Sequence, residues 1–199
     1  MMKRLIPALL GLVAGSAMAA ASVGKAAPDF TLSDLNGKTI KLADFKGKHV
    51  VLEWHNPNCP FVVKHYDSGN MPALQNKYDA RDTVWLSVNS TNPAHQDFMS
   101  NGKLKGYLAE KKAAPDAYLI DPEGTTGIEY GAKTTPHMYV INPAGTLVYA
   151  GAIDDKRSTR LEDVKIATNY LVAALDESRS GKAVTTANTQ PYGCSVKYK

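Results

Sequence analysis

A short apolar run that ends at a cysteine most constrains the fold of this chain. Residues 49–54 are mostly apolar and carry one acid, Glu53, a composition that predicts a buried strand. The Asn-Pro-Asn sequence at residues 56–58 ends this strand, and Cys59 and Pro60 follow. Proline is tolerated at the first position of a helix, because its missing N–H would have no partner there. We therefore predict a strand, a turn that carries Cys59, and a helix that begins at Pro60.

The predicted position of Cys59 favours a reactive thiol. A helix N-terminus presents unpaired N–H groups and a positive dipole end, and both favour the thiolate. Lys64 and His65 lie a turn or two further along and are expected to add positive potential. The alternative is a buried, inert cysteine, the usual state of a single Cys. However, the neighbours of Cys59 are Pro57, Asn58 and Pro60 rather than core residues, so we expect a reactive thiol.

The rest of the chain alternates predicted strands with predicted helices. The strand-like segments are residues 28–32, 39–42, 83–88, 117–120, 137–141 and 146–149. The first predicted helix covers residues 60 to about 78, with a break near Gly69 or Pro72. The second opens at Asn92-Pro93 and runs toward Phe98, and its second half is weakened by Gly102 and Gly106. The third runs to residue 175 and is opened by a Thr159–Glu162 capping box. This order predicts an α/β fold with a central mixed sheet flanked by helices and an N-terminal β-hairpin.

The first 19 residues are predicted to be a secretory signal peptide. Lys3 and Arg4 precede an apolar stretch over residues 5–13, and residues 17–19 form an Ala-Met-Ala cleavage site. The stretch is too short to span a bilayer comfortably, so no stable membrane anchor is expected after cleavage. We therefore expect an exported protein, periplasmic or extracellular, in a compartment where thiols can form disulfides.

The charge of the chain argues against a nucleic-acid partner. The 199 residues carry a net charge of +4, and loss of the two basic residues at positions 3 and 4 leaves +2. The remaining chain has no cluster of Lys and Arg with interleaved aromatic residues, which is the usual signature of nucleic-acid binding.

In the order of these features the chain resembles the thioredoxin-like superfamily, and most closely its peroxiredoxin-like redoxin group of the alkyl-hydroperoxide-reductase and thiol-specific-antioxidant type. Residues 59–62, Cys-Pro-Phe-Val, are similar to the C-P-x-C motif of that superfamily, with Val62 in place of the second cysteine. The segment that begins at Pro28 is similar to the N-terminal extension of redoxins. The resemblance covers residues 23–178 and implies a thioredoxin-like fold.

The resemblance also implies roles for individual residues. Cys59 matches the nucleophilic cysteine, and Glu53 matches the buried acid that accepts protons in many thioredoxins. Thr135 and Pro136 match the cis-proline segment that faces the thiol, and with Pro60 they are expected to shape a groove for a thiol partner. For Glu53, the alternative is a structural acid that forms a salt bridge with a lysine.

Two departures from the family limit what the resemblance implies. Position 62 is a valine rather than a cysteine, so dithiol exchange within a C-x-x-C motif is impossible. Peroxiredoxins place a Thr or Ser three residues before the reactive cysteine and a Pro four residues earlier, but this chain has Asn56 and Leu52 there. Peroxidase activity is therefore the less favoured function.

Cys194 is the candidate partner for Cys59. It lies in a polar C-terminal tail, residues 179–199, which is long enough to return across the domain. A pair with Cys59 would be either catalytic, with Cys194 as the resolving thiol, or a static disulfide that holds the tail. The sequence leaves both possibilities open, together with two unpaired thiols.

Two functions follow from these residues. The first is an exported thiol–disulfide oxidoreductase that uses Cys59, Cys194 and Glu53, needs no cofactor, and reacts with a protein or small molecule that carries a thiol or disulfide. The second is a non-enzymatic binding protein on the same scaffold. It would have either a static Cys59–Cys194 disulfide or a copper site that combines Cys59 with histidines, of which the candidates are His55, His65 and His137.

Overall fold

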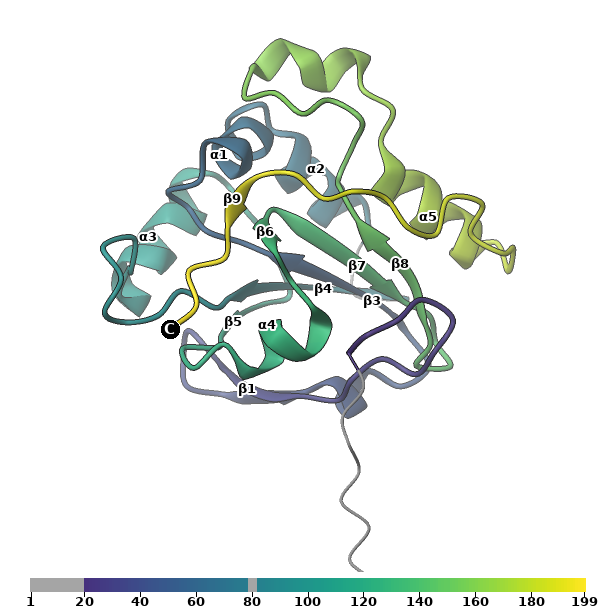
Figure 1. Cartoon of the computed structure of the whole chain (residues 1–199), viewed down its shortest axis with the longest axis horizontal. Coiled ribbons are helices and arrows are strands. Elements are labelled where there is room, and N and C mark those ends of the chain that lie inside the picture. The colour runs from purple at the N-terminus through teal and green to yellow at the C-terminus, as the bar shows by residue number, and fades with distance from the viewer. Residues whose placement is uncertain (1–19, 79–81) are drawn as a thin grey trace, which may run out of the picture.

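A seven-stranded mixed sheet forms the centre of the molecule (Figure 1). The computed structural model describes residues 20–78 and 82–199. The order across the sheet is β2-β1-β5-β4-β3-β7-β8, in which β3 runs parallel to β4 and antiparallel to β7. A separate pair is formed by β6 and β9. The strands are β1 (Thr31–Asp34), β2 (Thr39–Lys41), β3 (His49–Trp54), β4 (Thr83–Asn89), β5 (Ala117–Ile120), β6 (Thr134–Thr135), β7 (His137–Ile141), β8 (Leu147–Gly151) and β9 (Cys194–Ser195).

Both faces of the sheet are covered. Successive side chains of a strand point to opposite faces, so Val51 of β3 packs in one core cluster with α1, α2 and α5. Val50 and Leu52 pack in a second cluster with α4 and the N-terminal hairpin. The helices are α1 (Pro60–Asp67), α2 (Asn70–Lys77), α3 (Asn101–Glu110), α4 (Thr125–Tyr130) and α5 (Tyr170–Arg179), with the 3-10 helices η1 (Leu42–Phe45) and η2 (Leu161–Ile166).

The predicted fold class is confirmed. The central mixed sheet, the flanking helices and the N-terminal β1–β2 hairpin are all present. The strand predicted over residues 49–54 is β3 with the same bounds, and all six residues are buried. The helix predicted from Pro60 is interrupted at Gly69, whose φ of 72° lies in the left-handed region and separates α1 from α2.

The helix predicted to open at Asn92-Pro93 begins later than expected, although its second half is helical. The side chain of Asn92 accepts a hydrogen bond from the backbone N–H of Ala94 at 2.9 Å, which forms a local turn. An asparagine that bonds the backbone two residues further on offers the chain an alternative to a helix. The helix of this region, α3, begins only at Asn101.

The single helix predicted from Thr159 to residue 175 is wrong. The segment contains η2 and, after a break, α5. At the predicted start, Asp163 bonds the guanidinium of Arg160 at 2.8 Å and the hydroxyl of Ser158, and no Thr159 capping bond forms. The cap of α5 is instead Asn169, whose Oδ1 accepts a hydrogen bond from the N–H of Val172 at 2.9 Å.

Loss of this cap is expected to weaken the fold. Asn169→Ala leaves the Val172 N–H without its side-chain partner, which typically costs about 1 kcal/mol of stability. Urea unfolding followed by tryptophan fluorescence measures the loss. Ser100 precedes α3 in the same way but makes no side-chain capping bond, so Ser100→Ala serves as the matched control. Equal losses in the two variants would contradict the assignment of Asn169 as a cap.

The C-terminal tail is folded against the domain. After α5 it crosses the molecule to β6, where it forms β9 (Figure 1). On the way, the hydroxyl of Thr189 accepts a hydrogen bond from the N–H of Ala152 at 2.8 Å and lies 2.7 Å from the Tyr149 hydroxyl. Near the end of the tail, the Tyr198 hydroxyl donates to the carbonyl of Ala132 at 2.7 Å. The polar composition of the tail therefore reflects anchoring by hydrogen bonds.

The predicted signal segment, residues 1–19, lies outside the described residues. Within residues 20–78 and 82–199, no helix has the length and apolar character needed to cross a membrane.

Candidate active site

Cys59 lies at the junction between the central strand and the first helix. It follows β3 by five residues and occupies the N-cap position of α1, with Pro60 as the first helical residue. Pro60 is exposed beside it, whereas Cys59 itself is only 2% exposed. Its Sγ donates a hydrogen bond to the carbonyl oxygen of Thr135 at 2.8 Å. The predicted neighbourhood of Cys59 and Thr135 is therefore present, and it is closed to solvent.

The C-terminal tail brings Cys194 to the same carbonyl. β9 pairs with β6 in antiparallel register, so that Cys194 lies opposite Thr135, the residue before the cis peptide bond to Pro136. The Cys59 thiol is close enough to raise the pKa of Cys194, and both thiols are free. The chain thus places two cysteines that are 135 positions apart side by side at one edge strand.

Gly193 allows this close approach. Its φ of 142° lies in a region that L side chains rarely adopt, and a Cβ at this position would collide with the carbonyl oxygen of Thr135. The glycine beside Cys194 is therefore needed for the backbone of the tail to reach β6.

The environment of Cys194 keeps its thiol protonated. Burial, the hydrogen bond with Cys59 and the charge of Cys59 together raise the pKa of Cys194 to about 11. The thiolate is the form that attacks a disulfide. Of the two cysteines, Cys194 is therefore poorly suited to attack a disulfide first.

Glu53 is fully buried in the middle of β3. Its Oε1 accepts a hydrogen bond from the hydroxyl of Tyr66 at 2.9 Å, and its Oε2 accepts one from the indole N–H of Trp85 at 2.9 Å. Ser87 and Gln75 donate to Oε2 at longer distances. Desolvation raises the pKa of Glu53 to about 7, although these donors act in the opposite direction. All four partners are neutral, so the alternative of a lysine salt bridge is not what holds this acid.

An aromatic wall connects Glu53 with the segment before Cys59. The ring of His55 lies 4.8 Å from the ring of Tyr66 and 5.3 Å from that of Tyr118, measured between centroids. Its Nδ1 is 2.8 Å from the Tyr118 hydroxyl. Burial lowers the pKa of His55 to about 3, so the ring is neutral at physiological pH. Sequence reasoning missed these tyrosines, because nothing in their spacing distinguishes them from core residues.

Lys64 and His65 belong to a second buried cluster around Asp154, and the positive charge expected of His65 is corrected there. Both side chains lie 3.8 Å from Asp154, and the hydroxyl of Tyr192 also donates to Asp154. Burial, together with the nearby charge of Lys64, lowers the pKa of His65 to about 3, so this ring carries no charge near neutral pH. The cluster holds Tyr192, two residues before Cys194, and so anchors the tail.

The structure does not bring together the residues of the alternative copper site. His65 contacts Tyr192 and Asn70, whereas His137 contacts Tyr139, with its Nδ1 3.1 Å from the tyrosine hydroxyl. In the described part of the chain, no group of three or more His, Cys, Asp or Glu side chains is arranged to hold a metal ion. The geometry therefore gives no support to metal binding by Cys59 and these histidines.

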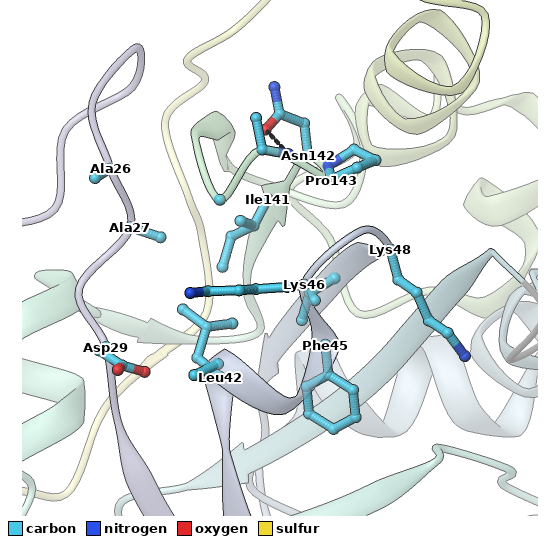
Figure 2. A pocket seen from close by; sticks show the side chains of 14 residues that line it. Ala26, Ala27, Asp29, Leu42, Phe45, Lys46, Lys48, Ile141, Asn142 and Pro143 are labelled. Carbon is cyan, nitrogen blue, oxygen red and sulfur yellow. Dashed lines mark hydrogen bonds between the residues drawn. The ribbon is translucent and has the colours of Figure 1, made fainter.

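A surface hollow of about 260 Å³ lies at the other end of the central strand (Figure 2). It is lined by the N-terminal segment, η1 and the β7–β8 turn, and Figure 2 shows the side chain of Lys46 lying across it between Leu42 and Ile141. Val50 lines it near the start of β3, whereas Cys59 follows the end of that strand. This hollow is therefore separate from the thiol pair.

Comparisons with known proteins find related sequences. A family model described as the AhpC/TSA family matches residues 23–150. The thiol-disulfide oxidoreductase ResA of Bacillus thuringiensis subsp. konkukian is 31% identical over 113 residues, which cover 51% of this chain and 65% of the relative. The match thus spans less than two thirds of that relative.

Solved structures show the same fold. An uncharacterized conserved protein from Geobacillus kaustophilus has a TM-score of 0.75 at 26% identity, and the match covers 89% of this chain and 93% of that one. The thioredoxin domain of a thiol-disulfide oxidoreductase from Bacteroides vulgatus has a TM-score of 0.52 at 21% identity, with 74% of this chain and 98% of that one covered. The predicted thioredoxin-like fold is confirmed.

Proposed function

We propose, from the premise that this chain belongs to the AhpC/TSA family, that it is a thiol–disulfide oxidoreductase in which Cys59 attacks and Cys194 resolves. The observation that carries the proposal is the contact of the two free thiols beside Thr135. A cysteine at position 62 is not needed for resolution, because β9 supplies the second thiol from the far end of the chain.

The exchange proceeds in two steps. The Cys59 thiolate attacks one sulfur of a partner disulfide, so that an Sγ–S bond forms, the S–S bond of the partner breaks, and the departing sulfur takes up a proton. Cys194 then loses its proton and attacks Cys59 Sγ, which forms the Cys59–Cys194 disulfide and releases the second partner sulfur as a thiol. The partner gains two electrons and two protons, and the reverse sequence oxidises a dithiol.

Glu53 is the proposed proton acceptor of this exchange. A carboxyl group with a pKa near 7 can both take up and release a proton at physiological pH, which is the property a general acid–base group requires. Its contact with Tyr66 links it to α1, the helix that begins at Cys59, and Tyr66 and Cys59 share one core cluster. Pro60, Thr135 and Pro136 are proposed to border the partner site around the thiol.

The partner is proposed to be a protein or small molecule that carries a thiol or disulfide, and the site of action an oxidising compartment outside the cytoplasm. The compartment follows from the signal pattern in residues 1–19. Peroxide reduction is the less favoured chemistry, because Asn56 and Leu52 replace the hydroxyl residue and the proline of the peroxidase motif.

Disulfide mapping tests the proposed function. The reduced chain is incubated at a series of ratios of glutathione to glutathione disulfide, quenched with acid, alkylated and analysed by mass spectrometry. We expect a Cys59–Cys194 disulfide that forms and reopens as the ratio changes, with a glutathione adduct on Cys59 as the intermediate. Cys59 that stays unmodified at every ratio would contradict the proposal. A disulfide that never reopens in excess glutathione would favour the static bond of a binding protein.

A further inference from the structure

The C-terminal tail blocks the approach to Cys59. Cys59 is 2% exposed, and Cys194 packs against the core cluster to which Cys59 belongs. The sulfur of an external disulfide must contact Cys59 Sγ to react, and Cys194 lies opposite Thr135, whose carbonyl Cys59 Sγ contacts. An external partner therefore has to take the place of the tail.

The backbone edge beneath the tail can accept an extended strand. β6 pairs with β9 through Thr134 opposite Ser195 and Thr135 opposite Cys194. The N–H of Val196 extends this pairing by donating to the carbonyl of Lys133 at 3.1 Å. Addition of an extended segment to a free strand edge is a common mode of peptide recognition, in which main-chain hydrogen bonds supply affinity and side-chain pockets supply specificity.

The side-chain pocket in this case holds Tyr192. The tyrosine is 7% exposed, and its hydroxyl lies 3.3 Å from Lys64 Nζ and 3.2 Å from His65 Nε2 and donates to Asp154. The ring packs edge-on against Phe61, with 5.7 Å between centroids. Lys64 and Asp154 are almost completely buried and also bond the backbone of Lys156, so loss of the hydroxyl would leave each buried charge with one polar partner fewer. The pocket therefore favours a group that is aromatic and also carries a hydroxyl.

We propose that the tail segment from Pro191 to Val196 is an internal occupant of the partner site, and that Cys59 acts on extended polypeptide segments that carry a tyrosine two residues before the reacting cysteine. This inference rests on the proposed function and names its substrate class. The tail leaves so that the partner strand can pair with β6, and Cys59 attacks the partner disulfide as described above. The tail then returns, and Cys194 displaces the partner thiol from Cys59.

A trapping experiment tests this proposal. The background is Cys194→Ser, which leaves Cys59 as the sole thiol. The probes are a peptide with the tail sequence of residues 190–197, whose cysteine is disulfide-bonded to 5-thio-2-nitrobenzoate, the same peptide with alanine for tyrosine, and glutathione bonded to the same chromophore. Cys59 attacks the sulfur of the probe's cysteine and releases 5-thio-2-nitrobenzoate, which is coloured. This thiol has a lower pKa than the cysteine thiol and therefore leaves faster. Mass spectrometry confirms the adduct on Cys59.

Loosening the tail is expected to accelerate the reaction. Tyr192→Ala in this background removes the anchor, so a larger fraction of the protein has an open site and the tyrosine peptide reacts about tenfold faster. With this variant the tyrosine peptide should react several-fold faster than the alanine peptide, because only the tyrosine fills the vacated pocket. Tyr192→Phe, which keeps the ring and loses the hydroxyl, should accelerate the reaction less. Lys182→Ala, at an exposed tail position outside this segment, is the matched control and should leave the rates unchanged.

Each contrary result has a distinct meaning. Rates that Tyr192→Ala and Tyr192→Phe leave unchanged would overturn the tail as an occupant of the site. If Tyr192→Ala accelerates the reaction but the tyrosine peptide and the alanine peptide react at equal rates, the proposed tyrosine pocket is overturned. In both cases a reaction with the glutathione probe would leave the proposed function standing. Absence of reaction with all three probes would remove the proposed function itself. Circular dichroism of each variant shows whether it is folded before its rates are compared.

Discussion

Cys59→Ser is expected to abolish thiol–disulfide exchange. A serine hydroxyl does not ionise near neutral pH and cannot form a disulfide, so the first step has no nucleophile. Removal of a reacting nucleophile lowers turnover by about three orders of magnitude or more. The measurement is the rate of reduction of a disulfide substrate by the full chain with a dithiol reductant. The fold should persist, because the exchange replaces one buried sulfur by oxygen beside the Thr135 carbonyl, which a hydroxyl can also bond.

Cys194→Ser is the matched variant for this prediction, because it removes the other sulfur of the pair. It should retain the first step and stall at a mixed disulfide on Cys59, which intact-mass analysis detects as an adduct of one partner thiol. Cys59→Ser should show no such adduct on Cys194, since burial, the largest cause of the raised pKa of that thiol, persists in this variant. Equal adduct formation on both cysteines would contradict the assigned order of attack.

Glu53 is expected to impose a pH dependence on stability that Glu53→Gln removes. The pKa of this group is 4.5 in the unfolded chain and about 7 in the folded protein. Below pH 4.5 both states are protonated and the stability contribution is fully present. As the pH rises to 7, the unfolded chain loses the proton while the folded protein keeps it, so the unfolded state is increasingly favoured. Across this window the free energy of unfolding should fall by about 3 kcal/mol on account of Glu53.

Urea unfolding from pH 4.5 to pH 8 measures this effect, with the fluorescence of Trp85, which contacts Glu53, as one reporter. The difference in unfolding free energy between the native chain and Glu53→Gln isolates this group, because the other titrating residues are common to both. Glu123 is an exposed acid, so Glu123→Gln should give a difference that does not change with pH. Parallel curves for the native chain and Glu53→Gln would contradict the buried-acid assignment.

The pH dependence of the exchange rate in Glu53→Gln separates a role of Glu53 in proton transfer from a structural role. If Glu53 takes part in proton transfer, the exchange rate of the native chain should change with pH near 7, and Glu53→Gln should lack that change. A variant that is slower by the same factor at every pH would indicate that Glu53 acts only through the packing of Tyr66 and Trp85. An unchanged pH profile therefore excludes the proton role.

Local sequence patterns were sufficient to predict the strand, turn and helix around Cys59. The apolar run of β3 and the proline at the start of α1 act within a few residues, so they are visible without knowledge of the fold. The two wrong helix starts have the same kind of explanation. Asn92 and Thr159 look like helix caps in sequence, but Asn92 forms a turn with Ala94, and Asp163 bonds Ser158 and Arg160 beside Thr159.

Long-range contacts assembled the rest of the candidate site. Nothing near Glu53 in sequence indicates its donors Trp85 and Ser87, because parallel pairing of β3 with β4 brings them together. The pocket of Tyr192 combines α1, Asp154 and the tail, which lie far apart along the chain. The sequence did carry one signal for the meeting of the tail with Thr135. Gly193, directly before Cys194, marks a close backbone approach.

By itself, the sequence determined that this chain forms a mixed α/β sheet with a cysteine at the first helix N-terminus, because strand and helix patterns are set by neighbouring residues. It also determined that the second cysteine lies on a tail, but it left open where that tail goes. Only the tertiary structure decided that Cys194 meets Cys59 at Thr135, since this contact depends on β9 pairing with β6 and on Tyr192 filling a buried charged pocket. The two cysteines lie 135 positions apart in the chain, and no local pattern encodes their meeting.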